Sequence, residues 1–291
     1  MDFKRFMSEA AEKVAEAIGV GVETTTVKKN NGIVLHGVVI QPKESNLSPT
    51  IYVDALYEKY KAGESMEWVV EEIIRIYDEN KVEERFDTKA FFDFETVKGK
   101  IIYKLVNAEA NKELLQTVPH KIVLDFAKIY YIDIEKSIFG VDACALIKNH
   151  LLEYWNVDVE EIFAAAEENT AKVLPETIIS MQSLVEQIAG EMEKNLGVEM
   201  YIATNIKRCN GAAIIYYEGV LKEFADKVGS DLFILPSSVH ETILIPKSEM
   251  MKAEVFRKMV MQVNQTQVAI EERLSDNVYI YRRDTGEIEI A

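Results

Sequence analysis

Two β-branched runs on either side of Asn31-Gly32 constrain the fold of this chain more than any other feature. Residues 22–42 read "VETTTVKKNNGIVLHGVVIQP", and Asn-Gly between alternating apolar runs is the strongest short-range signal for a β-hairpin. Before it, residues 3–18 place apolar side chains at helical spacing, and Gly19 ends that pattern. The N-terminal part is therefore predicted to be a helix followed by an antiparallel strand pair.

The same order of strands and helices recurs in the middle of the chain. Two segments rich in β-branched and aromatic residues, 122–134 and 139–148, predict another antiparallel strand pair. After each pair a short helix precedes a longer one that begins at a capping residue, Ser65 in the first case and Asp158 in the second. Two interpretations stay open: an internal ββαα duplication, or two unrelated strand pairs that are each followed by helices.

The remaining segments extend this pattern toward the C-terminus. Residues 86–119 are predicted to be mostly helical with a break near Gly99, and residues 212–219 are predicted to form a strand. Pro175 ends a helix, which predicts a boundary between domains 1–175 and 176–291. Antiparallel strand pairs with helices packed on them, plus a smaller C-terminal α/β portion, indicate the α+β class.

Charge and composition limit the partners of the protein. The chain has 49 acidic and 33 basic residues and a formal net charge of -16, so it repels a phosphate backbone and nucleic acid is not expected as a partner. No apolar stretch approaches the roughly 18 residues of a membrane span, and the N-terminus does not resemble a secretory signal. We therefore expect a cytoplasmic protein that does not bind membranes.

Several common chemistries lack their motifs. The 13 glycines include no phosphate-binding GxGxxG or GxxxxGK pattern, and the four histidines form no HExxH pair. The two cysteines, Cys144 and Cys209, cannot make a disulfide framework and are predicted to be small buried hydrophobic residues. The sequence thus predicts no cofactor-binding residues and no metal ligands.

One stretch still offers a candidate for catalysis. Residues 231–246, "DLFILPSSVHETILIP", place Ser237 and Ser238 close to His240 between two apolar runs. On a strand, Ser238 and His240 share one face, which is the arrangement in which a base activates a serine. The alternative is a turn between two core strands, in which His240 satisfies a backbone group. We favour the turn, because short Ser and His spacings without a surrounding motif match by chance.

Ordered blocks along nearly the whole chain resemble a bacterial family of about this length that is known only as a domain of unknown function. These blocks are residues 46–60, 98–120, 145–175, 219–246 and 263–283. A weaker resemblance extends to the YtpQ-like proteins, also of unknown function, in which Arg and Asp are expected where this chain has Ser238, Val239 and His240. Neither resemblance implies a catalytic or binding residue.

These observations lead to two functional hypotheses. The first is a non-enzymatic cytosolic protein that binds another protein or a small molecule through the concave side of its sheets. The alternative is a hydrolase-like enzyme with a site around Ser237, Ser238 and His240, assisted by a distant acid. If the largest pocket of the fold does not include His240, the enzyme hypothesis with these three residues fails.

Overall fold

The computed structural model describes residues 1–42, 45–82, 88–134, 143–189, 198–236 and 238–291. They belong to two compact units, the first with described residues from 1–89 and the second from 90–134 and 143–291. Residue 175, at which we predicted a domain boundary, lies inside the second unit. One hydrophobic core there takes side chains from both sides of that position, including Phe126, Ile162, Leu232 and Tyr279.

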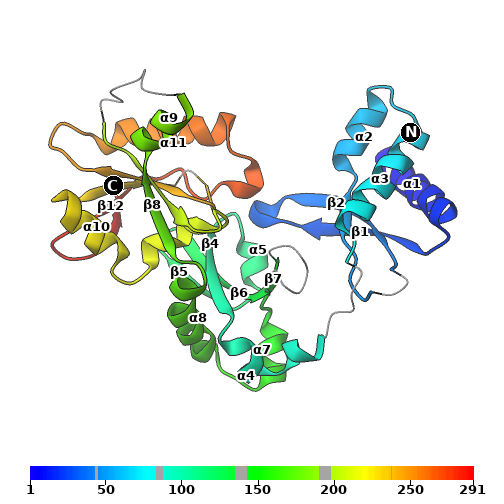
Figure 1. Ribbon diagram of the computed structural model, residues 1–291, viewed down its shortest axis with the longest axis horizontal. Coiled ribbons are helices and arrows are strands. Elements are labelled where there is room, and N and C mark those ends of the chain that lie inside the picture. The colour runs from blue at the N-terminus through cyan, green and yellow to red at the C-terminus, as the bar shows by residue number, and fades with distance from the viewer. Residues whose placement is uncertain (43–44, 83–87, 135–142, 190–197, 237) are drawn as a thin grey trace. The chain divides into compact units, whose positions relative to one another are not determined.

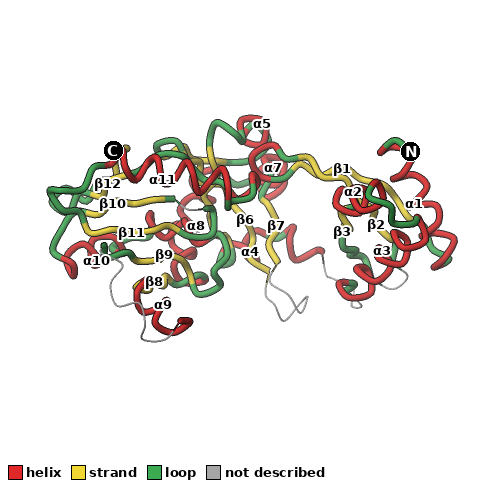
Figure 2. The backbone as a smooth tube through the Cα atoms, turned by 90° about the horizontal axis from the view of Figure 1, so that it is seen from above, coloured by secondary structure: helices red, strands yellow, loops and turns green. Residues whose placement is uncertain are grey.

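The first unit has the helix and hairpin that its sequence predicts. Helix α1 begins at the capping side chain of Asp2 and ends at Gly19, which has a left-handed backbone. The strands pair in the order β1-β2-β3, and α1 and α3 pack on them around a buried core (Figure 2). The elements are α1 (Phe3–Ile18), β1 (Val22–Lys28), η1 (Asn30–Gly32), β2 (Val34–Ile40), β3 (Thr50–Tyr52), α2 (Asp54–Lys61) and α3 (Met66–Asn80).

The second unit contains two sheets. Its first half provides η2 (Thr88–Phe92), α4 (Phe94–Lys98), β4 (Ile101–Asn107), α5 (Lys112–Leu115), β5 (His120–Val123), β6 (Phe126–Ile134), β7 (Ala143–Leu146), α7 (Asn149–Trp155) and α8 (Val159–Val173). Strands β4, β6 and β5 lie in that order, with β7 also paired to β6. Helix α8 packs on β4 (Figure 1), and the Thr170 hydroxyl accepts a hydrogen bond from the Tyr103 amide at 3.1 Å.

The second half of this unit forms the larger sheet, with strand order β13-β12-β10-β11-β9-β8. Its elements are β8 (Glu176–Ser180), α9 (Met181–Ala189), β9 (Tyr201–Asn205), η3 (Gly211–Tyr216), α10 (Val220–Val228), β10 (Leu232–Leu235), β11 (Thr242–Pro246), α11 (Ala253–Thr266), η4 (Ile270–Glu272), β12 (Tyr279–Tyr281) and β13 (Ile288–Ile290). All described strand pairs are antiparallel. The protein therefore has the α+β fold that the sequence predicts.

The prediction of mostly helix over residues 86–119 is wrong. Residues 101–107 form β4, a strand of the smaller sheet that pairs with β6 along its whole length. Side chains on both faces of β4 are buried, so its apolar run shows no alternation that separates a strand from a helix. The expected break near Gly99 marks the point where α4 ends.

The strand predicted at residues 212–219 is also wrong, because residues 211–216 form the 3-10 helix η3. A hairpin across Asn210-Gly211 would have to add a strand to β9. Both edges of β9 are already occupied, by β8 on one side and β11 on the other. The segment instead forms η3, which packs on β9, and Ala212 N–H donates to Val239 O at 3.1 Å.

The order of strands and helices recurs in the two units, but the strands pair differently in each. In the first unit β2 lies between β1 and β3, whereas β6 in the second unit pairs with β4, β5 and β7. An internal duplication therefore stays a prediction. Among the described helices, none combines the length and the apolar character that a bilayer crossing requires.

Candidate functional site

The stretch at residues 231–246 is a strand, a connection and a strand, as we favoured. Strands β10 and β11 pair from Leu232 opposite Pro246 to Leu235 opposite Ile243. Ser237 lies outside the described residues. Ser238 is buried, and its Oγ accepts a hydrogen bond from the His240 backbone N–H at 3.0 Å. The Ser238 hydroxyl therefore stabilises the backbone of the segment that connects β10 and β11.

Two contacts position the ring of His240, and a third holds its backbone. The Asn210 N–H donates to Nδ1 at 3.1 Å, and Nε2 lies 3.5 Å from Glu272 Oε1. The carbonyl of His240 accepts from the Thr204 hydroxyl at 2.8 Å. Because Nδ1 accepts a hydrogen bond, the neutral ring carries its proton on Nε2, next to the Glu272 carboxylate.

Cys209 is the nucleophilic group beside this ring. Its side chain is exposed, which corrects the expectation of a buried residue. The His240 ring lowers the pKa of Cys209, and the Cys209 thiol raises the pKa of His240. The Lys104 charge also lowers the Cys209 pKa, and Asn210 Nδ2 donates to Sγ at 3.1 Å. Such surroundings favour a thiolate, the reactive form of cysteine.

The backbone around Cys209 is held in an uncommon conformation. Arg208 and Asn210 have φ values of 50° and 53°, in the left-handed region that side chains other than glycine rarely adopt. The Asn205 side chain supports this turn, since its Nδ2 donates to Cys209 O at 2.9 Å and its Oδ1 accepts from Lys207 N–H at 3.0 Å. Backbone strain of this kind concentrates at functional sites.

The turn is also fixed to the smaller sheet. Lys207 Nζ lies 3.4 Å from Asp133 Oδ1 on β6. On the neighbouring strands, Lys104 Nζ donates to Cys144 Sγ at 2.8 Å and lies 4.0 Å from the centre of the Tyr131 ring. Cys144 is exposed, so the prediction of a buried residue is wrong for it as well.

The other three histidines belong to other elements. His36 bonds to Asp54 in the first unit, His120 lies at the start of β5, and His150 is exposed on α7. Within the described part of the chain, no group of three or more His, Cys, Asp or Glu side chains is arranged to hold a metal ion.

Comparison with known proteins defines the family. The model of a family described as "Family of unknown function (DUF5688)" matches residues 2–283. The chain belongs to this family. No other family model matches, so the weaker similarity to the YtpQ-like proteins stays a prediction. No curated protein and no solved structure matches the chain. Roles for the residues of the site must therefore come from their geometry.

Sequence reasoning singled out His240 as a candidate, but not Cys209 or Glu272. The cysteine precedes Asn210-Gly211, which we interpreted as a hairpin turn, and nothing in that pattern indicates that a distant histidine lies beside it. Glu272 is part of η4. Its backbone is hydrogen-bonded to the segment between β10 and β11, since Val239 N–H donates to Glu272 O at 2.8 Å. The site is assembled from separate segments, and their convergence becomes visible only in the fold.

Proposed function

We propose that Cys209 is the nucleophile of a thiol-dependent acyl-transfer or hydrolytic reaction, with His240 as its base. The observation that carries this proposal is that Asn210 links the two side chains: its N–H donates to His240 Nδ1 at 3.1 Å and its Nδ2 donates to Sγ of the exposed Cys209 at 3.1 Å. The residues on both sides of Cys209 have left-handed backbones. The proposal retains His240, which was part of the enzyme hypothesis, and has Cys209 as the nucleophile in place of Ser237 or Ser238. A cysteine and a histidine within hydrogen-bonding reach, with an acid behind the ring, form the usual arrangement for nucleophilic catalysis.

The proposed reaction proceeds in two steps. In the first, the thiol proton moves to Nδ1 of His240, which then no longer accepts from the Asn210 N–H. Sγ bonds to the carbonyl carbon of an acyl donor, and the bond to the leaving group breaks as that group takes the proton. In the second, water attacks the thioester and releases the acid and the thiol. Glu272 stabilises the charged ring between these transfers. Asn210 Nδ2, which donates to Sγ at 3.1 Å, is the donor that we assign to the developing oxyanion.

Access to the thiol does not depend on the cavities described in this structure. A cavity of about 460 Å³ in the first unit is lined by residues of α1, α3 and the end of β2, and one of about 360 Å³ in the second unit lies beside α8. Neither is lined by His240. Because Cys209 is exposed, a small acyl donor reaches it from solvent.

Acetylation by p-nitrophenyl acetate tests the proposal. We expect release of nitrophenolate with formation of an acetyl thioester on Cys209, located by mass spectrometry of peptides at acidic pH. The variant His240→Gln should slow this acetylation about 100-fold, since general-base assistance contributes at least that much. The matched control His150→Gln alters an exposed histidine on α7 and should leave the rate unchanged. Acetylation of Cys209 at the same rate in both variants would rule out His240 as the base.

A further inference from the structure

The cavity beside α8 has an aromatic floor and an acidic rim. It has a volume of about 360 Å³ and lies among α8, β4 and the segment that follows η3. Tyr103 and Tyr217 in its wall are buried, whereas the three glutamates around it are exposed. The lining residues are Tyr103, Glu167, Glu168, Ala171, Lys172, Tyr216, Tyr217 and Glu218.

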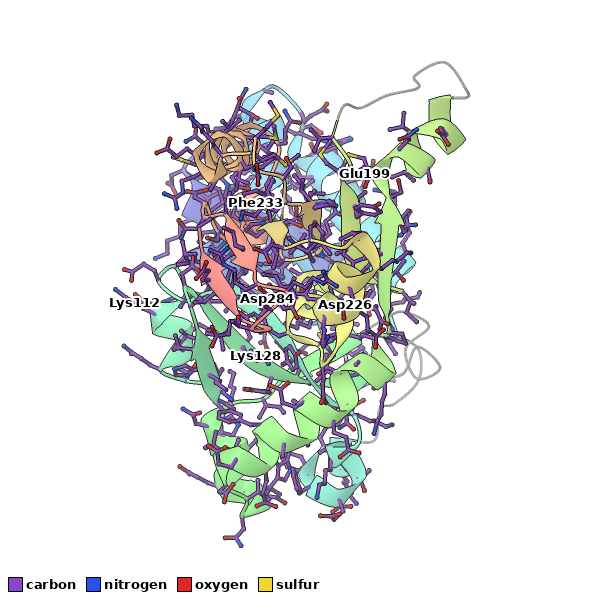
Figure 3. All side chains as sticks on the ribbon, turned by 90° about the vertical axis from the view of Figure 1, so that its left-hand side faces the viewer. Lys112, Lys128, Glu199, Asp226, Phe233 and Asp284 are labelled. Carbon is purple, nitrogen blue, oxygen red and sulfur yellow. The ribbon has the colours of Figure 1, made fainter. Side chains whose placement is uncertain are left out.

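The aromatic rings of this cavity already hold one cation of the chain. Lys128, on β6, is 5% exposed, and its Nζ lies 4.1 Å from the centre of the Tyr103 ring and 5.2 Å from that of Tyr216 (Figure 3). Burial lowers the pKa of Lys128, while its contact with Glu167 at 2.5 Å acts in the opposite direction. The faces of these tyrosines therefore provide favourable surroundings for positive charge.

Three tyrosine hydroxyls in and around this cavity have no hydrogen-bond partner among the described residues. They are the buried hydroxyls of Tyr130, Tyr216 and Tyr217. Tyr217 is 6% exposed as a whole residue and lines the cavity. Buried polar groups are nearly always bonded to protein, water or ligand, so these hydroxyls indicate a missing partner.

Two of the three glutamates at the rim form ion pairs with lysines, and the third is available to pair with a ligand. Lys172 Nζ lies 2.8 Å from Glu168, and Lys128 is paired with Glu167. Among the described residues Glu218 has no ion pair, and it is exposed next to the buried Tyr217. A positively charged ligand over Tyr217 would find its counter-ion there, whereas an anion would meet uncompensated negative charge.

We propose that this cavity binds a small organic cation, with Tyr217 and its neighbours in contact with the ammonium group and Glu218 as the counter-ion. Tyrosine rings together with a carboxylate are the groups that recognise alkylammonium ions. The site is separate from Cys209 and requires no thiol chemistry. The proposal names the chemical class of the small molecule that the binding hypothesis left open.

Calorimetric titration of the full chain with choline tests this proposal, with 3,3-dimethyl-1-butanol as its uncharged isostere. We expect choline to bind at millimolar concentration, and the alcohol to bind at least about tenfold more weakly, because it lacks the charge that the rings and Glu218 recognise. Ethanolamine shows whether a primary ammonium is accepted, and saturable binding of either cation supports the site.

Variants locate the binding on the protein. Glu218→Gln should weaken choline binding about tenfold, whereas Asp284→Asn, at another exposed carboxylate, should leave it unchanged. Both positions are exposed, so the fold is retained, which circular dichroism verifies. The proposal is overturned if the alcohol binds as tightly as choline, if neither cation binds up to about 10 mM, or if both variants weaken binding equally.

Discussion

Gly211→Ala is expected to lower the free energy of unfolding of the second unit by about 3 kcal/mol. A Cβ at this position would lie 2.1 Å from Thr204 Oγ1, 2.6 Å from His240 O and 2.7 Å from Asn205 N. Two of these atoms belong to the backbone, so the clash cannot be relieved by a side-chain rotation. The added methyl group must separate the Cys209 turn from the connection that carries His240.

Urea unfolding followed by tryptophan fluorescence measures this effect. The chain has two tryptophans, so a Trp68→Phe background leaves Trp155, which is 8% exposed, as the reporter of the second unit. The control Gly99→Ala has no atom within 4 Å of the added Cβ and should change the free energy by no more than about 0.5 kcal/mol. Equal stability of the two alanine variants would show that the turn and the connection are not packed as described.

Asp125→Ala is expected to destabilise the second unit by a similar amount, about 3 kcal/mol. Its Oδ1 accepts from the Tyr279 hydroxyl at 2.5 Å, and its Oδ2 accepts from Ser275 Oγ at 2.7 Å and Asn277 Nδ2 at 3.1 Å. Tyr279 and Ser275 are buried. Removal of the carboxylate takes away the charged acceptor that these donors share, and it loosens the β5-β6 turn from β12.

The same Trp155 measurement applies to this variant. Asp284→Asn is its control, because Asp284 is exposed and its replacement should change the free energy of unfolding by less than about 0.5 kcal/mol. Asp125→Asn keeps the shape of the side chain and one acceptor oxygen. Its loss of unfolding free energy should therefore lie between those of Asp125→Ala and Asp284→Asn. A loss for Asp125→Ala as small as for the control would mean that the three hydrogen bonds contribute little to stability.

Turns with strong local signals were predictable from the sequence. Asn31 has a φ of 57° between β1 and β2, and Gly229 ends α10 with a left-handed backbone, as their residue types suggest. The turn between β5 and β6 was missed, and residues 122–134 were interpreted as one strand. Leu124 has a φ of 56° there, and leucine gives no indication of such a turn.

Tertiary pairing decided the segments that the sequence left ambiguous. The apolar run of β4 fits a helix or a strand equally well, and its pairing with β6 selects the strand. The candidate site shows the same dependence. Local spacing placed Ser238 near the His240 ring, whereas in the fold that ring accepts a hydrogen bond from Asn210, the residue that follows Cys209. Nothing within one segment predicts contacts between segments that are distant in the chain.

The pH dependence of Cys209 alkylation tests the central claim most directly. In a Cys144→Ser background Cys209 is the remaining thiol, and its rate with iodoacetamide rises as pH increases through its pKa, because the thiolate is the reacting form. Since His240 lowers that pKa, the midpoint should lie below the ordinary value of an unperturbed cysteine. His240→Gln should move the midpoint upward. A midpoint at or above the ordinary value that His240→Gln does not change would contradict the account.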